Sequence, residues 1–202
     1  MSRILNSIPL LYVLMLFPGR LSIWDIFHGT WYYPQMMSES GQLSIWYLIL
    51  TLAVTPMLMV INRVGLGAAI GIWLLRRRKH FGLGSFIFAT VHALHYIRDT
   101  GDLGSLWFEA FYIEILVGWL ALVIFLVLAL TSNRASTRRL GRWWKPLHRF
   151  VYLAAALSFL HWYLFDFFTG RVLFWATLLV LVKLAHVGLH FLSAMSRKRG
   201  AA

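Results

Sequence analysis

The chain contains no cysteine and few charged residues. Of its 202 residues none is Cys, and only 13% are Asp, Glu, Lys or Arg. The absence of cysteine excludes disulfide bonds, thiolate ligation of haem iron and cysteine-held iron–sulfur clusters. Soluble domains average about 25% charged and about 45–50% apolar residues, whereas this chain is 60% hydrophobic with a mean hydropathy of +0.71. These values exclude a single water-soluble core.

Acidic side chains are scarcer than basic ones. There are 7 acidic and 19 basic residues, which give a formal net charge of +12. The basic residues lie in short clusters between apolar runs, a pattern typical of membrane topology and not of nucleic-acid binding. The candidate carboxylate within a span is Glu114. A proton pump, which relies on intramembrane carboxylates, is therefore disfavoured.

Six apolar segments approach the ~20 residues that cross a bilayer. We expect an all-α integral membrane protein, a six-helix bundle that forms a single domain over residues 1–202 with its core at 40–192. Pro9 and Pro18 interrupt the first span, and Gly65–Leu75 is short enough to be interfacial or re-entrant. The expected spans are Ile4–Leu21, Leu43–Ile61, Phe81–Ile97, Phe111–Leu130, Leu147–Phe168 and Arg171–Ala194.

The loops alternate in charge. Arg76–Lys79 and the basic residues of 134–145 fall on one side of the expected membrane, whereas Asp99, Asp102 and Glu109 fall on the other. Cytoplasmic loops carry an excess of Lys and Arg. The pattern therefore predicts that both termini are cytoplasmic, as an even number of spans requires.

Two histidines, His148 and His161, lie thirteen residues apart in the expected fifth span. An intramembrane histidine is a functional-site hypothesis, and histidine is an axial ligand of haem iron. At 1.5 Å per residue, His161 lies roughly 20 Å from the inner surface and His92 of the third span roughly 17 Å. This shared depth predicts that His92 and His161 clamp one haem between two helices.

His148 lies at the inner end of the fifth span, where it could ligate a second haem or serve as a relay. On an ideal helix it is about 140° away from His161. Either the span is kinked or begins irregularly after Pro146, or the two histidines face different neighbours. Candidates for its partner at a matching depth are His80, His186 and His190.

Four further residues are candidates for cofactor contact. His95, one turn outward of His92, is an alternative ligand or a partner behind the ligand. Arg149 could pair with a haem propionate or with lipid phosphate. Arg77 and Arg78 could meet an anionic cofactor or an electron donor, or act only as topology determinants.

The approach to the fifth span resembles a known family. Thr131-Ser132-Asn133 and the run Arg139–Leu153, RLGRWWKPLHRFVYL, resemble the ferric-reductase-like transmembrane superfamily, and within it the MsrQ (YedZ) family. The resemblance covers roughly residues 40–165. Supporting pieces are Thr55-Pro56, Arg76-Arg77-Arg78 with Gly82-Leu83, and Ala89-Thr90-Val91-His92.

The resemblance implies a b-type cytochrome of the bacterial inner membrane, with haem ligands at positions matching His92, His148 and His161. It implies one or two haems, with FMN or quinone as further cofactors to consider. Electrons would come from a cytoplasmic flavin reductase or from membrane quinol and pass to a periplasmic molybdopterin-dependent methionine sulfoxide reductase. The chain would then be an electron-transfer subunit and not a stand-alone enzyme. His80 and His95 are not expected of the family.

Other classes of function stay open at this point. A different haem b membrane cytochrome, such as a metal reductase or a quinol oxidase subunit, would show similar histidines. A non-redox transporter or assembly factor could carry them for structural reasons. A zinc site would need three or four converging ligands, and nothing in the sequence requires His92, His95 and Asp99 to converge.

Overall fold

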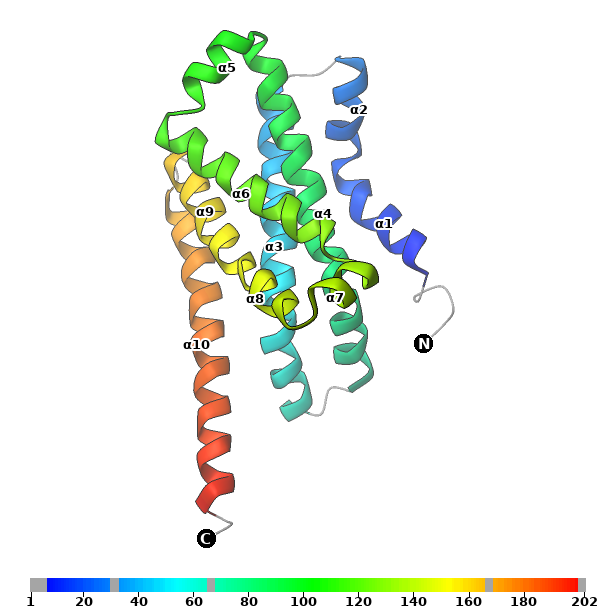
Figure 1. Ribbon diagram of the computed structural model, residues 1–202, viewed down its shortest axis with the longest axis vertical. Helices are drawn as coiled ribbons and strands as arrows, with labels where there is room; N and C mark the ends of the chain where they lie inside the picture. The colour runs from blue at the N-terminus through cyan, green and yellow to red at the C-terminus, as the bar shows by residue number, and fades with distance from the viewer. Residues whose placement is uncertain (1–6, 30–32, 65–67, 166–168, 200–202) are drawn as a thin grey trace.

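A computed structural model describes residues 7–29, 33–64, 68–165 and 169–199 of the chain, and the regular elements in these ranges are helices (Figure 1). Residues 4–6 and 166–168 of two expected spans lie outside this description. The elements are α1 (Ile8–Leu16), η2 (Phe17–Gly19), α2 (Arg20–His28), α3 (Tyr33–Val64), α4 (Ala68–Thr100), α5 (Leu103–Glu109), α6 (Ile113–Leu130), α7 (Arg134–Leu140), η3 (Gly141–Trp143), α8 (Trp144–Arg149), α9 (Val151–Phe165) and α10 (Thr169–Arg199).

Two helix pairs form the centre of the bundle (Figure 1). α3 and α4 run antiparallel and pack along much of their length, and α6 packs against α9. α10 lies against α3 and α9, while α1 and α2 contact α3 and α4 from another side. The largest cluster of buried apolar side chains joins the two pairs to α10 and contains Ile45, Leu48, Leu52, Phe125, Ala154, Ala155, Phe159 and Val172.

Four stretches within the described ranges are long and apolar enough to cross a membrane: Ile8–His28, Pro34–Leu58, Ile113–Leu130 and Gly170–Gly188. Their outward faces carry large exposed apolar side chains such as Leu130 and Leu184, which suit lipid. α4 is more polar because it carries Arg76–Lys79 and three histidines, and α9 has only 15 residues. The protein is a multi-pass helical membrane protein, and the count of six spans stays a prediction.

The first expected span is bent by its prolines, as the sequence suggests. Pro9 lies in the first turn of α1, where a missing N–H costs little. Pro18 lies in the short 3₁₀ turn that separates α1 from α2. Proline lacks the N–H donor that a continuous α-helix would need there. The chain therefore forms a 3₁₀ turn at this point and then continues as α2.

The expected fifth span is interrupted close to its inner end. α8 ends at Arg149, Phe150 N–H donates to the Leu147 carbonyl at 3.1 Å, and α9 begins at Val151. A hydrogen bond from an N–H to the carbonyl three residues earlier, as in a 3₁₀-helix, changes the rotation per residue about the helix axis. The alternative of an irregular or kinked helix after Pro146 is therefore confirmed, and the ideal 140° phase does not apply to His148 and His161.

The segment expected to be separate and interfacial is instead the start of a long helix. The described part, Ala68–Leu75, continues without a break into α4, which has 33 residues. Residues 68–79 contain no proline, so the helix has no strong signal at which to end before Arg76. The expectation of a separate re-entrant element was wrong for these residues.

The native absence of cysteine allows a direct test of orientation. Two variants, Ser105→Cys in α5 and Ala135→Cys in α7, each carry one cysteine at an exposed position. These positions lie in the chain before and after α6, near its opposite ends. In intact cells we expect a membrane-impermeant maleimide to label the first and not the second, because basic loops stay cytoplasmic. Both should be labelled after permeabilisation. Labelling of Ala135→Cys alone in intact cells would invert the assigned topology.

Candidate functional site

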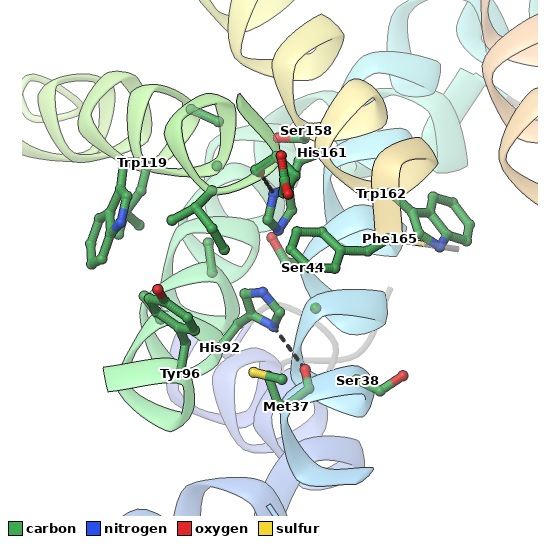
Figure 2. A pocket seen from close by; sticks show the side chains of 18 of the residues that line it. Met37, Ser38, Ser44, His92, Tyr96, Trp119, Ser158, His161, Trp162 and Phe165 are labelled. Atoms are coloured by element: carbon green, nitrogen blue, oxygen red, sulfur yellow. Dashed lines mark hydrogen bonds between the residues drawn. The ribbon is translucent and has the colours of Figure 1, made fainter. Parts of the chain in front are cut away.

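A cavity of about 640 Å³ lies between the two helix pairs and the start of α10. His92 reaches it from α4 and His161 from α9 (Figure 2). The surrounding positions include several small residues, which leave room for a flat ligand of ordinary cofactor size. These small residues are Gly41, Ser44, Ala89, Ala93, Gly118, Ala121 and Ser158.

The two imidazoles are held in the same way. The Nδ1–H of His92 donates to the Met37 carbonyl of α3 at 2.8 Å, and the Nδ1–H of His161 donates to the Glu114 carbonyl of α6 at 2.6 Å. A carbonyl can only accept, so each hydrogen bond places the ring proton on Nδ1 and leaves a lone pair on Nε2. Figure 2 shows the hydrogen-bonded edges turned apart and the other edges turned toward each other.

The spacing of the two rings fits one shared metal. Their centroids are 5.8 Å apart and their planes are at 85°. Two imidazoles on opposite faces of one metal, with metal–nitrogen bonds of about 2 Å, place their centroids about 6 Å apart. A metal-ligating histidine usually donates its other N–H to a carbonyl or carboxylate, as both rings do here.

The donor set favours haem over a metal held by protein ligands alone. Within the described residues, no group of three or more His, Cys, Asp or Glu side chains could hold a metal ion. Zinc needs three or four such ligands, whereas haem iron needs only one or two axial ligands from the protein. His92 and His161 supply that number, and the zinc alternative with His95 and Asp99 finds no support in these ranges.

The outer end of the cavity is polar. Asp99, Glu109 and Arg171 line it, and the Tyr96 hydroxyl donates to Glu109 Oε2 at 2.8 Å. That hydrogen bond ties the end of α5 to α4. The cavity therefore combines a largely apolar lining with one polar end, as ligand sites commonly do.

His148 lies outside this cavity, in α8. Its Nε2 shares a hydrogen bond with Thr131 Oγ1 at 3.1 Å, and its ring stacks on Trp144 with centroids 4.0 Å apart. Trp144 Nε1 in turn donates to the Thr131 carbonyl at 3.0 Å. His80, a candidate partner of His148, makes a different contact, with its Nδ1 2.9 Å from the Tyr12 hydroxyl. The side chain of His190 lies outside the described residues.

His95 does not line the cavity, and its placement argues against the expected ligand role. The side chain is fully buried, and its Nε2 lies 3.0 Å from both the hydroxyl and the carbonyl oxygen of Ser22 in α2. Its Nδ1 lies 3.8 Å from Asp25. His95 therefore joins α4 to α2. Sequence reasoning missed Ser22 and Asp25, although their spacing of three residues places them on one helix face.

The three arginines expected at a cofactor also lie outside this cavity. Arg78 Nε donates to the Thr51 carbonyl of α3 at 3.0 Å, and its Nη1 donates to Thr55 Oγ1 at 3.3 Å. The Arg77 guanidinium lies 5.7 Å from the centre of the Trp73 ring. Arg149 is exposed on α8. Their placement supports roles in helix packing and at the protein surface, and not contact with the His92–His161 site.

The fold and this site define a class: a helical membrane protein with two half-buried histidines that face each other across one cavity. The family model described as the ferric reductase like transmembrane component matches residues 40–159, more than half of the chain. The chain therefore belongs to the ferric-reductase-like transmembrane family and, with the relatives described next, to its MsrQ branch, as its sequence indicates.

Three relatives carry the name protein-methionine-sulfoxide reductase heme-binding subunit MsrQ. The one from Deinococcus radiodurans is 38% identical over 154 residues, which cover 73% of this chain and 72% of the relative. Those from Cronobacter sakazakii and Brucella melitensis are 35% and 39% identical, over 61% and 59% of this chain. The chain spans 60% and 53% of the length of these two. No solved structure matches the chain.

The buried contact between α2 and α4 makes a prediction about stability. Ser22→Ala removes the hydroxyl that contacts the buried His95 ring and donates to the Met36 carbonyl at 3.0 Å, and we expect a loss of about 1–3 kcal/mol because buried polar groups depend on their hydrogen bonds. The matched control is Thr137→Ala, which removes an exposed hydroxyl bonded only within α7. Thermal unfolding in detergent checks both, and equal unfolding temperatures for the two variants would contradict the assigned contact.

Proposed function

We propose that the chain is the haem-binding, electron-transferring membrane subunit of a methionine sulfoxide reductase system. The observation that carries the proposal is the pair of half-buried imidazoles, His92 and His161, whose unprotonated nitrogens face one another across one cavity. The names of the MsrQ relatives support both the haem and the reductase system.

The residues of the cavity fit a b-type haem. His92 and His161 would hold its iron, and the Met37 and Glu114 carbonyls keep both imidazoles in the ligating tautomer. Bound haem iron supplies a one-electron carrier whose potential depends on its axial ligands and burial. The apolar part of the lining keeps water from the imidazoles.

The same proposal includes the electron donor and the electron acceptor of the chain. Electrons enter from a cytoplasmic flavin reductase or from membrane quinol and leave to a periplasmic molybdopterin-dependent methionine sulfoxide reductase. The proposal also includes six spans, with both termini in the cytoplasm of a bacterial inner membrane. The exposed basic residues of α7, Arg134, Arg138 and Arg139, give the inner side a surface for an acidic donor.

His148 belongs to the inner side of the membrane in this proposal. A second haem or an FMN would bind there, near the side on which electrons enter. Iron ligation by His148 Nε2 would require that nitrogen to exchange its hydrogen bond with Thr131 for the metal. The cavity haem does not depend on this residue, because His148 does not line the cavity.

Removal of either facing histidine tests the haem site. We expect purified His92→Ala and His161→Ala to lose the b-type reduced-minus-oxidised spectrum of the cavity haem, since one imidazole alone cannot complete the axial pair. We expect His148→Ala to retain it. Haem per chain, measured as the pyridine haemochrome, checks all three variants. A wild-type chain without haem, or an unchanged spectrum in the double variant His92→Ala/His161→Ala, would contradict the proposal.

The direction of electron flow has a separate test. In inverted membrane vesicles loaded with the molybdopterin partner and methionine sulfoxide, reduction of the cytochrome by quinol or by flavin reductase with NADH should be followed by its reoxidation. Vesicles that hold methionine instead of its sulfoxide are the control. Reoxidation by ferric iron but not by the partner with sulfoxide would favour the rival reading as a metal reductase.

A further inference from the structure

Each facing histidine packs against a glycine on the neighbouring helix. The accepting carbonyl on α3 belongs to Met37, and Gly41 follows it by four residues; on α6 the carbonyl of Glu114 is followed by Gly118. Both glycines line the cavity. The same unit, a carbonyl followed one turn later by a glycine, therefore occurs once in each helix pair.

Helix geometry explains why a glycine is needed at this spacing. The carbonyl of residue i accepts the N–H of residue i+4 and keeps a second lone pair for another donor. The side chain of residue i+4 leans toward the N-terminus and covers the turn that holds this carbonyl. A side chain at Gly41 or Gly118 would therefore lie where the imidazole approaches.

The distances bear this out at both positions. A Cβ added to Gly41 would lie 3.0 Å from His92 Nδ1 and 3.2 Å from its Cε1. A Cβ added to Gly118 would lie 2.8 Å from His161 Nδ1 and 2.9 Å from its Cε1. By contrast, a Cβ at Gly188 of α10 would meet nothing within 4 Å.

We propose that Gly41 and Gly118 are paired positioning residues that seat the two imidazoles with their planes nearly perpendicular at the haem. The proposal rests on the haem site proposed above and adds which residues fix the orientation of its ligands. The planes are at 85° because each ring is pinned by one carbonyl and one glycine on a different helix. Such contacts behind a ligand orient it and tune the metal.

The angle between the two imidazole planes determines the EPR signal of the haem. A purely structural role of the two glycines would leave this signal unchanged. A low-spin ferric haem with perpendicular imidazole planes gives a single, highly anisotropic EPR signal, whereas parallel planes give a rhombic signal with three resolved lines. We expect the anisotropic signal for the purified wild-type chain. We expect Gly41→Ala and Gly118→Ala each to turn one ring and move the signal toward the rhombic form, with a shifted midpoint potential.

Gly188→Ala is the matched control, since it makes the same change in a helix without a neighbouring ring. It should keep the wild-type haem content, EPR signal and potential. A rhombic signal in the wild-type chain would overturn the proposal. It would also be overturned if Gly41→Ala and Gly118→Ala both kept full haem and the wild-type signal.

A double-mutant cycle tests the proposal even if an alanine variant loses haem or unfolds more easily. It compares the effect of Gly41→Ala on the unfolding temperature with and without the His92 ring. In the wild-type background Gly41→Ala should lower the unfolding temperature, because the new Cβ collides with the His92 ring. In the His92→Ala background that collision is gone, and Gly41→Ala should be neutral or stabilising because alanine favours helix. An equal loss in both backgrounds would overturn the proposal. The cycle needs no haem and therefore tests the seating of His92 by Gly41 separately from the proposed function, which a haem-free wild-type chain would contradict.

Discussion

The site depends on one interaction made twice, the hydrogen bond from an imidazole Nδ1–H to a helix carbonyl. His92 makes it across α3 and α4, and His161 makes it across α6 and α9. In a membrane interior, where no water replaces a lost partner, this bond both satisfies a buried donor and selects the tautomer with a lone pair on Nε2. The two free nitrogens then define a single point between the helix pairs.

The remaining architecture serves to hold these two hydrogen bonds at the right separation. The apolar cluster around Leu48, Phe125 and Ala154 joins one pair to the other. The Ser44 hydroxyl donates to the Ser85 carbonyl at 2.9 Å and ties α3 to α4. The polar contacts of His95 attach α2 to the outside of α4. A ligand that bridges the pairs therefore meets positions that are set before it binds.

Much of the fold follows from the sequence because its signals are local. Long apolar runs predict membrane helices, basic clusters predict orientation, and Pro18 predicts the break in the first span. The shared depth of His92 and His161 follows from the rise per residue alone. The start of α4 at Ala68 escaped prediction because hydropathy reports burial in lipid and does not report where a helix ends.

The fine structure of the site could not be predicted, because its partners are backbone atoms on other helices. Any residue at position 37 or 114 would present the same carbonyl, so the sequence holds no sign of these acceptors. Gly41 and Gly118 are visible in the sequence but resemble ordinary packing glycines until the rings are placed against them. The contact of His95 with Ser22 of α2 is equally invisible in the sequence, where depth and helix face only suggest an alternative ligand or a partner behind the ligand.

The central claim is that His92 and His161 bind one iron from its two sides. Near-infrared magnetic circular dichroism of the oxidised, purified protein tests it most directly, because the energy of the porphyrin-to-iron charge-transfer band identifies the axial ligand pair. We expect the band of a low-spin haem with two neutral imidazole ligands. A high-spin band, or the band of a histidine–methionine pair, would contradict it.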